Sequence, residues 1–314
     1  MTLESTFNTA EITAADDKNH SPGTPADELW QESWGFMWYD PLARIAGYCH
    51  TGMQPARAVA DVWSWVALRG ELIHRFEHLA LPLPSDDYTD LKVGPLHIRS
   101  IEPNTQRVVT VRSQEIHAEL AYRAFTLPLV PFGKNVKSEH ISTGHYQTIG
   151  TVSGTLSALG QTFQVKGFAF DDRSWGPRNW QDQLTHRACW ACFGDDLFCT
   201  MWHLTSPRGV ACLGYVYDHG HLERVPHVEV EVTMAADGIS PIGYTFTGWT
   251  ESGRGYRITG RADGSNIMTQ RDGFMQCAAV GRFEYGDRIG VGACEVNELK
   301  RPAPWHREHL GRGL

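Results

Sequence analysis

The chain has 314 residues, enough for one large or two ordinary domains, and its 41% hydrophobic and 20% charged residues are typical of a globular protein. A formal net charge of -8 without any basic stripe argues against a nucleic-acid partner. No stretch is long and apolar enough for a membrane span, and the first residues lack the features of a signal peptide, so we expect a cytoplasmic protein.

The chain begins with a polar segment. Residues 1–27 are rich in Thr, Asp and Pro, which predicts a disordered tail. Aromatic side chains in residues 32–39 then predict a first strand, which Asp40-Pro41 ends. A second short strand is expected at residues 45–50.

Residues 59–79 allow two interpretations. Their Val and Trp content and a turn around Gly70 predict a β-hairpin. A helix would instead bring His74 and His78 within one turn of each other, a common spacing of metal ligands. The turn favours the hairpin, and we expect no metal site here. Cys189 and Cys192, the only C-x-x-C pair, are expected to be buried thiols rather than metal ligands.

Short alternating runs continue along the chain. Ile116, Ala118, Leu120 and Tyr122 alternate with mostly polar side chains, the pattern of a half-exposed strand. Further strands are expected at residues 96–101, 107–112, 144–154, 162–170, 186–193, 197–204, 210–218, 221–225, 228–233, 244–250, 255–261, 273–285 and 290–296. No helix of ordinary length and no glycine-rich phosphate loop can be recognised.

Many short strands at a spacing of roughly 8–12 residues predict an all-β fold. The length suggests two antiparallel β-barrels, and the glycines within the strands suggest bends or bulges. The irregular segment 127–140 is the expected boundary. We therefore predict domains at 28–135 and 136–301, with the central hairpin open to being shared, and a second tail at 302–314.

The densest polar cluster of the chain lies in residues 167–180. Its functional side chains are Asp171, Asp172, Arg173, Ser174, Trp175 and Arg178. Because side chains alternate along a strand, Asp172 and Ser174 should share one face, and Asp171, Arg173 and Trp175 the other. We expect the Asp172 carboxylate to lie within hydrogen-bond reach of Arg173, Arg178 or a Trp N–H. The cluster could serve catalysis, or it could be a structural Asp–Arg pair that closes a barrel end.

Several strings point to one family. They are Gly144-His145-Tyr146, Gly150-Thr151-Val152-Ser153-Gly154, Asp172-Arg173-Ser174-Trp175-Gly176-Pro177-Arg178, Glu32-Ser33-Trp34, Asp40-Pro41 and Gly290-Val291-Gly292-Ala293-Cys294-Glu295. From about Glu32 to Glu298, the chain thereby resembles the lipocalin-like superfamily of hydroxyneurosporene synthase, also called carotenoid 1,2-hydratase.

The resemblance implies two calycin-like β-barrels packed together, with a ligand pocket at or between them. Characterised members act without organic cofactors on apolar substrates: they hydrate alkenes, or guide cyclisation and Diels–Alder reactions of polyketides and alkaloids. The chain departs from the family pattern at Asp171, where an arginine is expected. A second carboxylate near Asp172 would raise the pKa of one of the pair, unless strand alternation points the two apart.

These features predict a cofactor-independent lyase or isomerase that hydrates, dehydrates or cyclises a hydrophobic terpenoid, steroid or polyketide-like substrate. Such a reaction needs an acid in a dry pocket with aromatic walls. The candidate acids are Asp172 and Glu295, the candidate proton relay is His145 and Tyr146, the orienting cations are Arg173 and Arg178, and the candidate walls are Trp34, Trp38 and Trp175.

Two alternatives stay open. A non-catalytic lipocalin-like binding protein for an apolar metabolite needs the pocket but not the acid. A zinc hydrolase could use some of the 15 histidines, but these are scattered, and no Gly-x-Ser-x-Gly elbow supports a serine hydrolase. We expect no metal and no cofactor. The expected partner is a hydrophobic small molecule, and a homodimer is left open.

Overall fold

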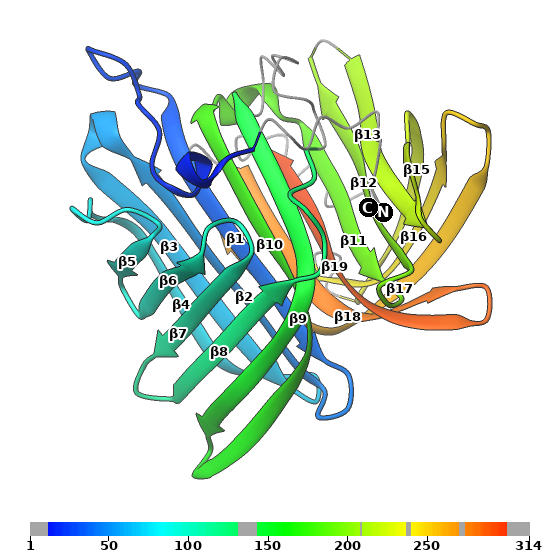
Figure 1. Ribbon diagram of the computed structural model, residues 1–314, viewed down its shortest axis with the longest axis horizontal. Helices are drawn as coiled ribbons and strands as arrows, with labels where there is room; N and C mark the ends of the chain where they lie inside the picture. Colours follow the sequence, from blue (N-terminus) through cyan, green and yellow to red (C-terminus); the bar gives the residue numbers. More distant parts are fainter. Residues whose placement is uncertain (1–11, 131–142, 208, 237–239, 270–273, 300–314) are drawn as a thin grey trace. The chain divides into compact units, whose positions relative to one another are not determined.

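The computed structural model describes residues 12–130, 143–207, 209–236, 240–269 and 274–299. These residues form β-strands and three short 3-10 helices and contain no α-helix (Figure 1), which confirms the all-β prediction. None of the described helices has the length and apolarity that crossing a membrane would require.

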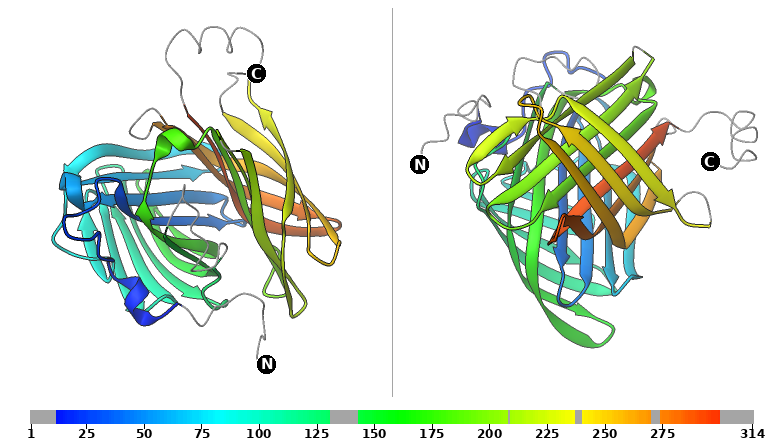
Figure 2. Two further views of the ribbon diagram at one scale, coloured as in Figure 1. Left: turned by 90° about the horizontal axis from the view of Figure 1, so that it is seen from above. Right: turned by 90° about the vertical axis from the view of Figure 1, so that its right-hand side faces the viewer.

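The chain divides into two compact units, Met1–Arg178 and Asn179–Leu314. The first unit holds a ten-stranded antiparallel sheet in the order β4-β3-β2-β1-β10-β9-β8-β7-β6-β5, which curves around its own core (Figure 2). Its strands are β1 (Trp30–Asp40), β2 (Ile45–Gln54), β3 (Val59–Leu68), β4 (Glu71–Pro82), β5 (Asp90–Val93), β6 (Leu96–Glu102), β7 (Gln106–Arg112), β8 (Ile116–Ala124), β9 (Gly144–Ala158) and β10 (Gln161–Pro177).

The second unit repeats this arrangement with nine strands, in the order β14-β13-β12-β11-β19-β18-β17-β16-β15. Its strands are β11 (Thr185–Cys192), β12 (Leu197–Ser206), β13 (Gly209–Asp218), β14 (His221–Arg224), β15 (His227–Met234), β16 (Pro241–Trp249), β17 (Gly255–Thr269), β18 (Phe274–Tyr285) and β19 (Arg288–Leu299). In each unit the last strand returns to pair with the first, β10 with β1 and β19 with β11.

The long hairpin β9–β10 is the centre of the first unit. Its two-residue turn is Leu159-Gly160, where both residues have positive φ angles of 53° and 72°, as a tight hairpin turn requires. At Gly167 a Cβ would lie 1.9 Å from the carbonyl oxygen of Tyr39, so only glycine allows β10 and β1 to approach so closely. The pairing register between β10 and β9 runs through Gly167 without a shift, so this glycine marks a close approach rather than a bulge.

Each unit has its own hydrophobic core inside its curved sheet. In the first unit the core contains Trp34, Phe36, Trp38, Ile98, Val109, Leu120 and Leu156, all essentially inaccessible to solvent. In the second it contains Met201, Phe246, Ile258, Phe283 and Cys294. Residues 59–82 form the expected hairpin, and the helical alternative for His74 and His78 does not occur.

The chain organisation differs from the prediction in two places. The expected boundary at residues 135/136 lies outside the described residues, and the division between units falls instead after Arg178, because β9 and β10 pair with β8 and β1 of the first sheet. Residues 12–27 are also not a disordered tail: Thr13 caps the 3-10 helix η2 (Ala14–Asp17), and Asp17 is completely buried. Residues 1–11 and the expected tail at 302–314 lie outside the described residues.

Candidate functional site

The two faces of β10 carry two different polar clusters, as the alternation predicts. Asp171 and Arg173 are completely buried on the face that turns to the core of the first unit. Asp172 and Ser174 occupy the opposite face, where the side chain of Asp172 is 18% exposed. The two aspartates are therefore neighbours in sequence but belong to separate sites.

On the core side, Asp171 is held by two donors. It accepts hydrogen bonds from Trp34 Nε1 at 2.6 Å and from Arg107 Nε at 2.8 Å. Arg107 also donates to Asp17 and, at 3.1 Å, to the hydroxyl of Tyr146. Burial raises the pKa of Asp171, because the Arg107 charge only partly offsets the desolvation of its carboxylate. Burial opposes ionisation of Asp17 as well, but Arg107, the Ser100 hydroxyl and Arg173 together outweigh it, and the pKa of Asp17 is lowered.

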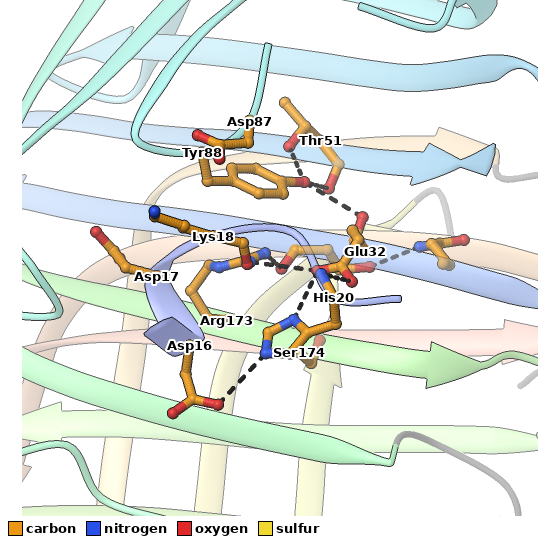
Figure 3. Close-up of polar contacts among 12 residues, drawn as sticks. Asp16, Asp17, Lys18, His20, Glu32, Thr51, Asp87, Tyr88, Arg173 and Ser174 are labelled. Atoms are coloured by element: carbon orange, nitrogen blue, oxygen red, sulfur yellow. Dashed lines mark hydrogen bonds and ion pairs between the residues drawn. The ribbon is translucent and has the colours of Figure 1, made fainter. Parts of the chain in front are cut away.

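Arg173 belongs to a second core-side group (Figure 3). Its guanidinium lies 3.9 Å from the centre of the Tyr88 ring and donates to the backbone oxygens of Ser33 at 2.9 Å and Lys18 at 3.0 Å. It also reaches a Glu32 carboxylate oxygen at 3.3 Å. The sequence suggested that Arg173 orients Asp172. This expectation is wrong, because the side chain of Arg173 points to the other face of β10.

The opposite face is organised in rows that run across five strands, β3-β2-β1-β10-β9. We call one of them the polar row; its members, aligned in register, are Trp63, His50, Gly35, Asp172 and Gln147. A neighbouring apolar row consists of Trp65, Tyr48, Met37, Phe170 and Ile149. All five side chains of the apolar row are buried, with exposed fractions of 2% or less.

Asp172 is the charged centre of the polar row. His145 Nε2 lies 2.7 Å from Asp172 Oδ2, and the Gln147 amide donates to the same oxygen. Burial alone would raise the pKa of Asp172, but His145, Gln147 and the charge of Arg178 together lower it. The group is therefore a carboxylate at neutral pH. The sequence suggested the Arg173 guanidinium or a Trp N–H as partners of the Asp172 carboxylate, but its partners are His145 and Gln147. The indole N–H of Trp34 donates to the neighbouring Asp171 instead.

His50 lies on the far side of Gly35 from Asp172 in the polar row, next to Trp63. Its ring stacks on Trp63, with the ring centroids 3.9 Å apart and the two planes within 6° of parallel. Burial lowers the pKa of His50 to about 3, although the Asp172 charge acts in the opposite direction, so the ring is neutral. Gly35 separates His50 from Asp172. A Cβ at Gly35 would lie 3.5 Å from the Tyr48 ring and hydroxyl and 3.8 Å from Asp172 Cβ.

The structure brings only part of the predicted site together. His145 and Asp172 are in contact, and Arg178 lies next to them through its hydrogen bond to Ser174. Tyr146 lies on the core face, where burial raises its pKa, so it cannot share a proton relay with His145. The predicted walls are also elsewhere: Trp34 and Trp38 are part of the core, and Trp175 stacks on His20 at 3.7 Å.

Glu295, the other predicted acid, lies on β19 of the second unit. It accepts hydrogen bonds from Gln276 Nε2 at 2.8 Å and Asn297 Nδ2 at 3.0 Å, and His186 Nδ1 lies 3.7 Å from its second oxygen. Since β10 and β19 hold the same place in the strand orders of their sheets, Asp172 and Glu295 occupy corresponding strands. Each is bonded to an amide side chain and lies close to an imidazole.

Sequence reasoning missed Gln147, His50, Gly35 and Trp63. They lie on four strands besides β10, namely β9, β2, β1 and β3, and only the pairing register brings them into line with Asp172. The sequence offered one signal for this arrangement: His50 and Trp63 fall in two strands that are predicted to be consecutive along the chain, and consecutive strands often pair. Among the residues that the structure describes, no group of three or more His, Cys, Asp or Glu side chains is placed to hold a metal.

Comparison with known proteins identifies a matching sequence family and solved structures with the same fold. The sequence model of a domain of unknown function, DUF7064, matches residues 13–300. Among curated proteins, none matches the chain. Solved structures with the same fold include CghA, which is 14% identical with a TM-score of 0.61, and covers 87% of this chain and 89% of its own.

Two further structures share the fold. Kievitone hydratase from Nectria haematococca is 10% identical with a TM-score of 0.63, over 94% of this chain and 96% of its own. The protein named AttH from Nitrosomonas europaea is 15% identical with a TM-score of 0.69, over 91% and 96%. These identities show a common fold alone. The expected lipocalin-like fold is thus confirmed, whereas the resemblance to carotenoid 1,2-hydratase itself stays a prediction.

Proposed function

The chain belongs to the DUF7064 family. We propose that it is a cofactor-independent enzyme of the lyase or isomerase type, which hydrates, dehydrates or cyclises a hydrophobic terpenoid, steroid or polyketide-like molecule. The observation that carries the proposal is the Asp172–His145 pair, with its 2.7 Å hydrogen bond, beside a row of buried apolar side chains. Kievitone hydratase, named for a hydration, and CghA, crystallised with Sch210972, have the same fold.

The imidazole of His145 is the proton carrier in this proposal. Because the pKa of Asp172 is lowered, Asp172 is ionised at neutral pH and cannot itself be the acid. A carboxylate that accepts a hydrogen bond from His145 Nε2 fixes the orientation of the ring and its tautomer. His145 can then give a proton to the substrate or take one from it, and Asp172 acts by charge and orientation.

The surroundings support a dry reaction centre. The Arg178 guanidinium donates to Ser174 Oγ and helps to keep Asp172 ionised. Met37, Phe170 and Ile149 of the apolar row provide apolar side chains beside this pair. They exclude water, and exclusion of water strengthens the electrostatic effect of the Asp172–His145 pair.

Proton transfer to carbon can be tested without knowing the substrate. The protein is incubated in D₂O with a panel of terpenoids, steroids and polyketides, and each compound is examined by mass spectrometry for deuterium uptake or for gain or loss of water. We expect wild-type protein to change at least one compound. His145→Phe and Asp172→Asn should lower that rate by about 10²–10⁴-fold, the usual contribution of general acid–base catalysis.

His117→Gln is the matched control, since His117 is an exposed histidine on β8. It should keep the wild-type rate. Full turnover by a folded Asp172→Asn protein would remove the pair from the mechanism, and Glu295→Gln would then test the corresponding carboxylate of the second unit. Tight retention of a compound without any conversion would instead favour the alternative, a non-catalytic lipocalin-like binding protein.

A further inference from the structure

Three polar atoms on β2 and β3, where the polar row and the neighbouring apolar row both end, have no assigned role. The indole Nε1 atoms of Trp63 and Trp65 and the ring Nδ1 of His50 are buried, and none has a hydrogen-bond partner among the described residues. Trp63 and Trp65 are only 1% and 0% exposed. A buried N–H without a partner is rare in folded proteins, because its desolvation is not compensated.

These three side chains lie together. Trp63 and Trp65 are two residues apart on β3, so both project from the same face, and His50 stacks directly on Trp63. In the register, His50 is also the row neighbour of Gly35, which in turn pairs with Asp172. The unpartnered atoms therefore lie on the same face of the sheet as His145, and the nearest of them in the row, on His50, is separated from Asp172 by the Gly35 position alone.

The chemistry of the group defines what it can bind. An indole N–H is a donor only, and a neutral imidazole nitrogen can donate or accept. Burial keeps His50 neutral, so the group carries no charge that would attract an ion. Two fixed donors and one adaptable atom in an aromatic setting suit an uncharged oxygen acceptor.

We propose that Trp63, Trp65 and His50 form a subsite that hydrogen-bonds a carbonyl oxygen of an otherwise apolar substrate. The inference rests on the proposed function in one respect: it calls the bound molecule a substrate. The binding of a carbonyl oxygen is argued from the three side chains alone. Hydrogen bonds to a carbonyl draw electron density from the carbons next to it, which makes their protons and any conjugated double bond more reactive. That activation matches a proton carrier as mild as an imidazole, so the subsite narrows the substrate class to ketones, aldehydes and enones.

The test uses a pair of probes that differ only in the oxygen, 1-tetralone and tetralin. Equilibrium dialysis gives the two affinities, and infrared difference spectroscopy with ¹³C-labelled 1-tetralone gives the carbonyl stretching frequency. We expect wild-type protein to bind 1-tetralone at least tenfold more tightly than tetralin. The bound carbonyl should absorb at lower frequency than in cyclohexane, because it accepts hydrogen bonds.

Three variants localise the effect. Trp63→Phe and Trp65→Phe remove the N–H and keep an aromatic ring, and His50→Phe keeps a ring that can stack on Trp63. Each should lower the preference for the ketone and raise the carbonyl frequency. Trp38→Phe is the matched control: its Nε1 is likewise buried without a partner among the described residues, but it lies in the core on the other face of the sheet.

Equal affinities for the two probes, or a carbonyl frequency in wild-type protein equal to that in cyclohexane, would overturn the proposal whether or not the variants fold. An equal loss of ketone preference in Trp38→Phe would overturn it as well. Because dialysis and infrared measure binding alone, these outcomes are independent of turnover. Asp172→Asn, which tests the proposed reaction, should keep the full preference for 1-tetralone.

Discussion

Asp171 and Asp172 are adjacent identical residues whose surroundings give them opposite properties. Burial raises the pKa of Asp171, whereas the pKa of Asp172 is lowered by its hydrogen-bond partners and nearby charges despite burial. The cause is the strand alternation, which sends one carboxylate into the core beside Arg107 and the other to the polar row beside His145. Electrostatic environment, rather than residue type, therefore distinguishes Asp171 from Asp172, the residue to which we assign the proposed chemical role.

Arg107 should be among the most important single side chains for stability. It is 1% exposed and contacts the carboxylates of both Asp17 and Asp171. Arg107→Leu leaves two buried acids without their cation, and breaking a buried pair in this way costs about 3–5 kcal/mol. We expect a loss of this size in urea unfolding. The exposed Arg282, whose partner Glu284 is also exposed, provides the control: Arg282→Leu should change the free energy of unfolding by less than about 1 kcal/mol.

Gly35 should matter for ligand access rather than for folding. The methyl group of Gly35→Ala would be in ordinary contact with Tyr48 and Asp172, so the substitution fits without a clash. It would, however, occupy the space between His50 and Asp172. We expect an unchanged melting temperature within about 3 °C and at least tenfold weaker binding of 1-tetralone.

Gly255→Ala is the matched control for this substitution, because its Cβ would make similar contact, 3.5 Å from the Trp249 ring, in the second unit. It should affect neither quantity. Wild-type affinity in Gly35→Ala would show that no ligand uses the space at Gly35, and a large loss of stability would give the glycine a structural role instead.

At the scale of elements, the segment from Thr13 to His20 closes one end of the first sheet. Asp17 reaches Arg107. The Lys18 carbonyl accepts from Arg173, and His20 contacts Glu32 (Figure 3). Its apolar contribution is small, and among the described residues its aromatic contact is the stack of His20 on Trp175. Charged hydrogen bonds therefore hold this segment in place.

Asp17→Asn should release the segment without unfolding the sheet. The neutral side chain loses its ion pair with Arg107, and the segment then opens more often. Because Lys18 is exposed, trypsin can cleave after it once the backbone detaches from Arg173. We expect cleavage at Lys18 to become about tenfold faster or more at neutral pH. Asp86→Asn, at an exposed loop position, should leave the rate unchanged; equal rates in all three proteins would show that Asp17 does not hold the segment.

The elements also show what the sequence could and could not predict. The two-residue period of side chains is a local signal, and it correctly assigned the hairpins and the two faces of β10. Contacts between distant strands are set by register, which no local pattern encodes. Trp34 bonds Asp171 across 137 sequence positions, so it could not be foreseen as a core residue from its own neighbours. The burial of Asp17 within a polar N-terminal segment was missed for the same reason.

At the scale of the whole molecule, the same strand arrangement occurs twice, each time around a separate core. The first unit extends to Arg178 because its last strand, β10, must return to β1 to complete the sheet. Composition and turn signals marked residues 127–140 as a boundary, but those signals report only local irregularity. The closing strand, a long-range feature, decides where a unit ends.

Separate cores predict that damage to one unit stays local. Phe246 is completely buried in the core of the second unit, and Phe246→Ala should cost about 3–5 kcal/mol there, through lost burial and the cavity it leaves. Hydrogen exchange followed by mass spectrometry should show faster exchange in β15, β16 and β17, while β7 and β8 of the first unit keep wild-type protection. Leu120→Ala, in the core of the first unit, should give the reciprocal pattern. If either substitution instead raised exchange equally in both units, the two cores would unfold as one cooperative structure, and the division after Arg178 would describe geometry but not stability.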